Sequence, residues 1–208
     1  WSMTEHGRRK LVLHSVLGGR VSEEAFADLL EGGPPDFFRG QNNREVAVLI
    51  LRVFNHSTLC QEMKAKDLIE MTNLFLENSG EFLTSRGGYL DESSPDCVRV
   101  YFGIIRRDAE PASTACAAAV ELRQRLENLN EDLDGRFFHK LEFGIAVGVD
   151  QMTLGIYRSQ NATRLSALGE GVDYVRRLCA ANAWYGSRIL VDSGVFSKLR
   201  DSFAFRPM

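Results

Sequence analysis

The hydrophobic and polar positions of the chain follow two periods, one typical of strands and one typical of helices. Residues 44–54 contain an apolar run that predicts a buried strand. Further strands are predicted at 89–91, 97–102, 141–149, 152–157 and 188–191, with another beginning at 203–206. Apolar residues recur at helical spacing in 61–84, 111–129, 171–183 and 193–199. This order indicates an α+β fold with a ferredoxin-like split βαβ core, in which helices pack on one face of a mainly antiparallel sheet.

Two of the predicted helices show their buried face most clearly. In 61–84 this face holds Leu68, Met71, Phe75 and Phe82. The helix at 111–129 starts at a proline, which suits the first helical turn, and its buried face holds Ala115, Ala119, Leu122, Leu126 and Leu129. Both helices are therefore expected to pack on the sheet.

The first 43 residues have a different pattern. Two short helical segments, "GRRKLVLHSVL" and "SEEAFADLLEG", are separated by "GGR", and Ser22 is a suitable N-cap for the second. The stretch "GGPPDFFRGQNN" then interrupts helix formation. We interpret residues 1–43 as a helical arm or linker and residues 44–208 as the domain.

Composition narrows the class of protein. The chain has 208 residues, of which 44% are hydrophobic and 25% charged, as expected for one ordinary domain plus an appendage. The formal net charge of −3 gives no basic footprint, so no nucleic-acid partner is expected. The four cysteines show no C-x-x-C spacing and are interpreted as reduced thiols of a cytoplasmic protein. There is no signal peptide and no apolar run of membrane-spanning length, so a membrane link is expected only through regions outside this chain.

Several motifs together resemble one family. "GGYLDESSPDCVRVYFG", "LEFGIAVGVDQMTLGIYRS" and "LGEGVDYVRRLCAANAWYGSRILVD" follow one another in the order found in the catalytic domain of class III nucleotidyl cyclases. The resemblance covers residues 44–206. It implies a reaction in which the ribose 3′-oxygen of a nucleoside triphosphate attacks the α-phosphate and releases pyrophosphate. It also implies two divalent ions, held by two aspartates.

The resemblance places the two metal-binding positions on Arg52 and Asp96, and Pro95 replaces the glycine that usually precedes the second aspartate. A dication about 4 Å from a guanidinium would be repelled by about 8 kcal/mol at an effective dielectric near 20. Arg52 is expected to form a bidentate pair with Asp96 across the strands. The alternative is that Arg52 reaches solvent and pairs with nothing.

The other family positions are altered as well. The base-recognising positions fall on Glu92, as in guanylyl cyclases, and on Glu170; solvated charge is the alternative for both. The positions that serve the transition state fall on Asp173, where the family has asparagine, and on Arg177. Because these two residues are four apart on one helix, they could also simply pair with each other.

The loop after the first strand resembles the phosphate-binding loop of the family. Asn55, Ser57 and Thr58 are the candidate phosphate ligands, although His56 replaces the usual aromatic residue. Asn55 tolerates a positive φ, and Ser57 or Thr58 could cap the following helix without any ligand. A further phosphate-binding lysine of the family lies beyond a later strand, so the domain is expected to continue past Met208.

Three functions remain open on this basis. The first is a cyclase homology domain that has lost metal-dependent activity and serves as a regulatory, nucleotide-sensing or dimerising module. The second is an active cyclase, for instance one half of a heterodimer, which would use Mg²⁺ or Mn²⁺ with ATP or GTP. The third is a protein-interaction domain without a nucleotide site.

The leading interpretation needs no cofactor, and it expects a homodimer or a pairing with a second cyclase domain. The apolar surface for that contact is expected from Val98, Val100 and Phe102 of the hairpin and from Tyr174.

Overall fold

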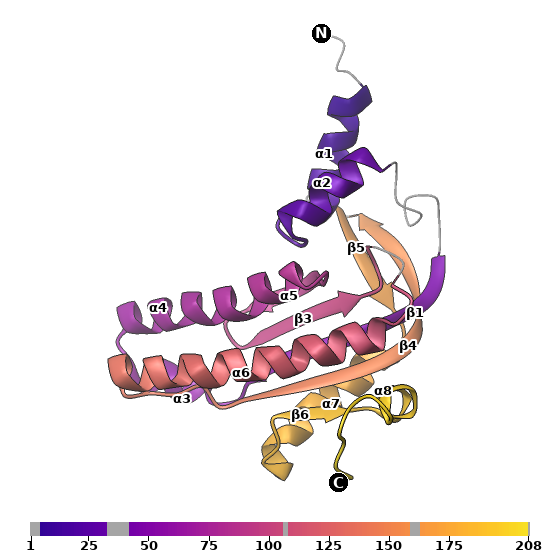
Figure 1. Cartoon of the computed structure of the whole chain (residues 1–208). Coiled ribbons are helices and arrows are strands. Elements are labelled where there is room, and N and C mark those ends of the chain that lie inside the picture. The colour runs from indigo at the N-terminus through magenta and orange to yellow at the C-terminus, as the bar shows by residue number, and fades with distance from the viewer. Residues whose placement is uncertain (1–4, 33–41, 106–107, 159–162, 208) are drawn as a thin grey trace.

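The computed structural model describes residues 5–32, 42–105, 108–158 and 163–207. Within these residues the sheet has the order β2-β3-β1-β4-β5, and β6 pairs with β4 in parallel. The strands are β1 (Asn42–Val53), β2 (Tyr89–Ser94), β3 (Cys97–Phe102), β4 (Phe143–Arg158), β5 (Thr163–Leu168) and β6 (Ile189–Val191). All other pairings are antiparallel, so the predicted α+β fold with a mainly antiparallel sheet is confirmed (Figure 1).

The helices connect and cover these strands. They are α1 (Glu5–Leu17), α2 (Glu23–Glu31), α3 (His56–Glu62), α4 (Ala65–Leu76), α5 (Phe82–Ser85), α6 (Pro111–Phe137), α7 (Gly171–Tyr185) and α8 (Ser193–Leu199), with a π-helical turn at Glu77–Glu81. Among these helices none is long and apolar enough to cross a membrane. The strands and helices from β1 to β4 follow the predicted split βαβ order (Figure 1).

Strand β1 is buried on both faces, which explains its continuous apolar run. Leu49 and Leu51 point into a cluster that includes the buried face of α6. Val48 and Ile50 point the other way, into a cluster with residues of α7 and α1. The sequence interpretation placed helices on one face of the sheet only, and this is wrong, because α7 covers the opposite face from α6.

Two glycines of β4 allow α7 to lie this close to the sheet. A Cβ atom at Gly144 would come within 2.6 Å of Cβ of Asn182, and one at Gly148 within 2.3 Å of Cγ2 of Val175. Real side chains do not approach so closely. Small residues at these two positions therefore fix where α7, and the site residues it carries, can sit.

Several predicted elements differ from the structure. Residues 141–157 were predicted as two strands, but β4 is one strand of 16 residues, and β5 was not predicted. The predicted helix 61–84 is interrupted after α3, where Met63 has an extended backbone. Residues 203–206 form no strand. The buried faces of α4 and α6 are confirmed by Met71 and Phe75 and by Leu122 and Leu126, each at most 1% exposed.

The hairpin does not offer the apolar surface that was expected for a partner. Val98, Val100 and Phe102 are at most 1% exposed and pack in the cluster beneath α6. This part of the prediction is wrong, because these alternate residues of β3 face inward. Tyr174 on α7 is 49% exposed, as expected.

The arm at the start of the chain contains the two predicted helices, and Ser22 caps α2 by accepting a hydrogen bond from the backbone N–H of Ala25. Leu13, Val16 and Leu17 of α1 are at most 2% exposed and join the cluster on the α7 side of the sheet. In Figure 1 α1 lies next to β5, and α2 lies against α1. Residues 1–4 and 33–41 of the predicted arm lie outside the described residues.

Candidate nucleotide site

Arg52 lies near the end of β1, opposite Cys97 of β3 and Gly144 of β4. It follows Val48 and Ile50 on the face that α7 covers, and its side chain is half-buried. Among the described residues its guanidinium has no acidic oxygen within 4.0 Å and makes no hydrogen bond. The predicted pair with Asp96 is therefore not formed, and the alternative, an arginine without an ion pair, describes the structure.

Asp96 is held in the turn of the β2–β3 hairpin. Its backbone carbonyl accepts a hydrogen bond of 2.9 Å from the N–H of Val53. Its carboxylate accepts one of 3.1 Å from the hydroxyl of Ser94. The carboxylate of Asp96, which was predicted to pair with Arg52, is therefore bound within the turn of its own hairpin.

The charge of Arg52 affects the pKa of two nearby thiols, Cys97 and Cys179. Burial raises the pKa of Cys97 to about 11 and that of Cys179 to about 12. In both cases the positive charge of Arg52 acts in the opposite direction and lowers the pKa. Both thiols are therefore protonated near neutral pH and leave the guanidinium charge uncompensated.

This end of the sheet does not fit a divalent metal ion. A pair of Mg²⁺ or Mn²⁺ ions needs several carboxylate oxygens, and here one of the two expected carboxylates is replaced by a cation. Within the described ranges no group of three or more His, Cys, Asp and Glu side chains is arranged to hold a metal. The residues present argue against metal binding at Arg52 and Asp96.

Glu92, the first candidate base contact, is paired within the hairpin. Its carboxylate lies 2.9 Å from the guanidinium of Arg99, and its side chain is 39% exposed. The same guanidinium lies 2.7 Å from the carboxylate of Asp91. A register shift in the β2–β3 pairing between Leu90 and Glu92 accompanies this arrangement.

Asp91 is the centre of a network that sequence reasoning missed. It is 3% exposed and contacts Arg99, the hydroxyl of Tyr101 at 3.2 Å and Arg164 of β5 at 2.9 Å. Its backbone carbonyl accepts a hydrogen bond from Arg20, between α1 and α2. Burial disfavours the charged Arg99, but Tyr101, Asp91 and Glu92 outweigh it and raise its pKa. The signal in the sequence was Arg99, a charged residue on the same face of β3 as Cys97 and Tyr101, which belong to the cluster on the α7 side of the sheet.

The side chains of the three candidates on α7 do not pair with one another. Glu170 is the exposed N-cap residue of α7, and its side chain makes no capping hydrogen bond. Asp173 pairs with Arg176 at 2.7 Å, so the suggested pairing with Arg177 is wrong. Arg177 is exposed and makes no ion pair with any described residue.

Of the three candidate phosphate ligands in the loop after β1, Asn55 is already engaged within the fold. Asn55 bridges to the segment before β4: its amide donates to the carbonyl of Lys140 and its oxygen accepts from the N–H of Glu142, both at 2.9 Å. Its φ is −97°, so the tolerance for positive φ is not used. Ser57 and Thr58 are exposed within the first turn of α3 and do not cap it, because the helix already begins at His56.

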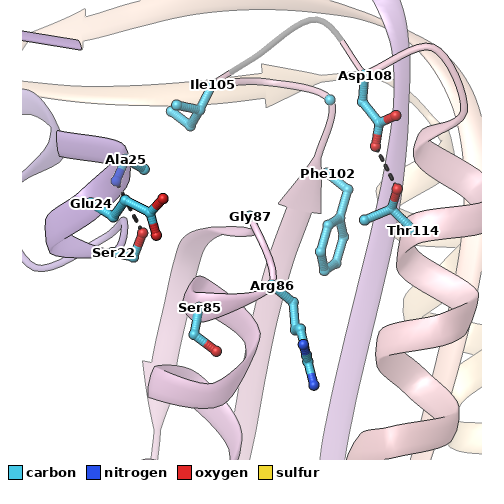
Figure 2. A pocket seen from close by; sticks show the side chains of 11 residues that line it. Ser22, Glu24, Ala25, Ser85, Arg86, Gly87, Phe102, Ile105, Asp108 and Thr114 are labelled. Carbon is cyan, nitrogen blue, oxygen red and sulfur yellow. Dashed lines mark hydrogen bonds between the residues drawn. The ribbon is translucent and has the colours of Figure 1, made fainter. Parts of the chain in front are cut away.

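A hollow of about 380 Å³ lies away from all of these residues, between the arm, α5 and the start of α6 (Figure 2). Several of its polar lining side chains have local partners: Thr114 donates to Asp108 at 2.7 Å, and Ser22 caps α2. This hollow contains none of the candidate residues.

Comparison with known proteins agrees with the fold and the motif order. No family model matches the chain. A curated relative, adenylate cyclase 1 of Rhizobium meliloti (strain 1021), is 22% identical over 167 residues, which is 79% of this chain but only 25% of the relative. The chain thus spans about a quarter of that protein.

Two solved structures match the fold. The adenylyl cyclase CyaB from P. aeruginosa has a TM-score of 0.72 and 20% identity, covering 79% of this chain and 85% of that chain. The guanylyl cyclase Cya2 has a TM-score of 0.68 and 21% identity, covering 76% and 79%. The chain therefore has the fold of a class III cyclase catalytic domain. Its curated sequence relatives include three adenylate cyclases, and the resemblance seen in the motifs is confirmed.

Proposed function

We propose that this chain is a class III cyclase homology domain that has lost metal-dependent cyclisation and acts as a regulatory, dimerising module in cyclic-nucleotide signalling. The observation that carries the proposal is Arg52, a half-buried cation without an ion-pair partner among the described residues, at a position where the resemblance requires a metal-binding aspartate. A fixed positive charge there opposes two-metal chemistry. A cytoplasmic location is part of this proposal, and the four free cysteines support it.

The neighbouring positions support the same conclusion. Glu92 is engaged by Arg99, and Asp173 by Arg176. Neither carboxylate is therefore free for a substrate in the arrangement seen here. The resemblance also expects a dimer. The exposed residues that suit a partner surface are on α7, where Tyr174 is 49%, Tyr185 64% and Trp184 90% exposed.

The test is a turnover assay on the purified chain with ATP and with GTP, each with Mg²⁺ and with Mn²⁺. We expect no cyclic nucleotide above the level of a blank without protein. The oligomeric state is measured in parallel by sedimentation at a protein concentration on the order of tens of micromolar, where a dimer of moderate affinity would be populated. Robust cyclic nucleotide formation would overturn the loss of activity, and a strict monomer would overturn the dimerising role.

A second candidate function is the transition-state half of a heterodimer. Exposed Arg177, without an ion pair among the described residues, favours it. The chain is mixed with a cyclase domain that keeps both metal aspartates but has its own transition-state arginine replaced by alanine. Restored activity with this chain, and none with its Arg177→Ala variant, would establish this role. An equal result for both proteins would exclude it.

A further inference from the structure

The half-buried arginines of the described residues fall into two groups. They are Arg20, Arg44, Arg52, Arg99, Arg123 and Arg164. Five of them have polar partners in backbone carbonyls or carboxylates. Arg52 is the exception among these residues, with no hydrogen bond and no ion pair from its side chain. A partly desolvated charge without a partner is costly, so its retention calls for an explanation.

The Arg52 guanidinium is accessible as well as unpaired. The fully buried side-chain nitrogens that lack a partner in the described ranges are Nε of Arg123 and Nε of Arg164. The nitrogens of Arg52 are not among them and therefore contact solvent. At the same time its neighbours Leu51 and Val53 are at most 3% exposed, which fixes the backbone from which the side chain extends. The result is a partly exposed cation on a buried strand backbone.

No negatively charged side chain of the described residues pairs with the Arg52 guanidinium. Glu92 is paired with Arg99. Asp96, on the adjacent turn, lies outside ion-pair distance and accepts a hydrogen bond from Ser94.

We propose that Arg52 binds the phosphate chain of an oligophosphate anion directly, without a metal ion. This inference rests on the proposed function, because it explains how a domain without a metal site could still sense a nucleotide. A guanidinium presents a planar fork of donors that matches two phosphate oxygens. The shared chemistry is an oligophosphate, which a nucleoside triphosphate or free tripolyphosphate could supply. The cation takes over the charge neutralisation that metal ions would otherwise provide.

The experiment is calorimetric titration of tripolyphosphate, ATP and GTP into the full chain in the presence of EDTA. Arg52→Gln removes the charge, and Arg200→Gln is the matched control on an exposed arginine of the C-terminal region. We expect metal-free binding to the native chain and an unchanged affinity in the control. In Arg52→Gln the affinity should fall about tenfold to a hundredfold, the range for a lost hydrogen bond to a charged group.

Two further variants keep the test independent of folding. Arg52→Lys retains the charge but not the fork and should bind more weakly than the native chain; equal affinity would overturn bidentate recognition. Asp96→Asn removes a negative charge beside the site and should strengthen metal-free binding. A weaker affinity in Asp96→Asn would indicate recognition through a cation held by Asp96 and would overturn the proposal.

The three ligands identify the source of the phosphate. Equal affinities indicate a site for the phosphate chain alone, while tighter binding of ATP or GTP indicates an added contact to the nucleoside; both support the site. Absence of binding in EDTA, binding that requires Mg²⁺, or an unchanged affinity in Arg52→Gln would overturn it. Cyclic nucleotide formed by the same samples with Mn²⁺ would contradict the proposed function instead, and the two failures are therefore distinguishable.

Discussion

Around Asp91 two arginines form ion pairs, whereas Arg52, in the next row of the same sheet face, forms no ion pair with any described residue. Arg99 lies opposite Ile50 of β1, and Arg52 lies opposite Cys97, so the two cations belong to adjacent rows. Asp91 is 3% exposed and contacts Arg99 at 2.7 Å and Arg164 at 2.9 Å. Arg52 is half-buried at the end of its strand, where solvent reaches it.

The difference shows what burial demands of a charge. At Asp91 water is excluded, so the carboxylate is stable only with several partners, and these partners tie β2, β3, β5 and the arm together. At Arg52 residual hydration offsets part of the desolvation cost, and no described side chain pairs with the guanidinium. The first cluster therefore serves stability, and the second position remains available for a ligand.

The largest effect is expected from Asp91→Ala. The substitution removes a carboxylate that pairs with Arg99, whose side chain is only 14% exposed. Because the arginine charge then stays largely buried with one partner fewer, the free energy of unfolding should fall by about 3–5 kcal/mol. Urea denaturation measures this change. The matched control is Asp96→Ala in the same hairpin, which loses only the contact with Ser94 and should cost less than about 1 kcal/mol. Equal losses in the two variants would contradict the contrast between the clusters.

A smaller effect on stability is expected from Arg52→Asp, which should also make stability depend on metal ions. The new carboxylate faces the hairpin that carries Asp96, so stability without metal should fall by about 1–2 kcal/mol, a usual range for one substitution. Mn²⁺ should then restore it, because an ion that binds only the folded state adds about 2.7 kcal/mol at a hundred times its dissociation constant. Thermal melts across a metal titration measure both effects. A native chain that responds to Mn²⁺ as strongly as the variant would refute the absence of a metal site.

The fold was predictable to a larger extent than the site. The apolar run of β1 and the spacing in α6 predict these elements because their burial is decided by periodicity along the chain. The division of β4 into two strands failed because polar Asp150 and Gln151 look like a turn, although both pair with β1 within the long strand. Local sequence could not show that the partner strand continues alongside them.

Side-chain partners were beyond the reach of the sequence. Arg52 and Asp96 come from adjacent elements, but a hydroxyl two residues from Asp96 is its partner. Asp173 could pair with a residue three or four positions later, and both spacings allow a helical ion pair; the structure selects Arg176. Asp91 and Arg164 are far apart in sequence and meet only because β5 and β2 approach each other. Each of these choices depends on side-chain direction or tertiary placement.

Arg52→Gln should change stability by less than about 0.5 kcal/mol, since it breaks no ion pair among the described residues. Urea denaturation beside Arg99→Gln, which loses contacts to Asp91 and Glu92, provides the comparison. A large loss in Arg52→Gln, similar to that in Arg99→Gln, would show that Arg52 has a structural partner in solution and would remove the distinction between the two regions.

The smallest effect concerns the reactivity of Cys97. Burial raises its pKa to about 11, Glu92 raises it too, and Arg52 lowers it. Only the thiolate reacts with iodoacetamide, so removing the Arg52 charge should raise the pKa further and slow alkylation at pH 8. We expect Arg52→Gln to slow the alkylation of Cys97 about two- to threefold, which corresponds to a rise in its pKa of about a few tenths of a unit. Exposed Cys60 in the same digest is the internal standard and Arg200→Gln the control variant. An unchanged ratio of Cys97 to Cys60 labelling would place the guanidinium away from Cys97, and Arg52 would then lie outside the sheet face on which the comparison with Asp91 depends.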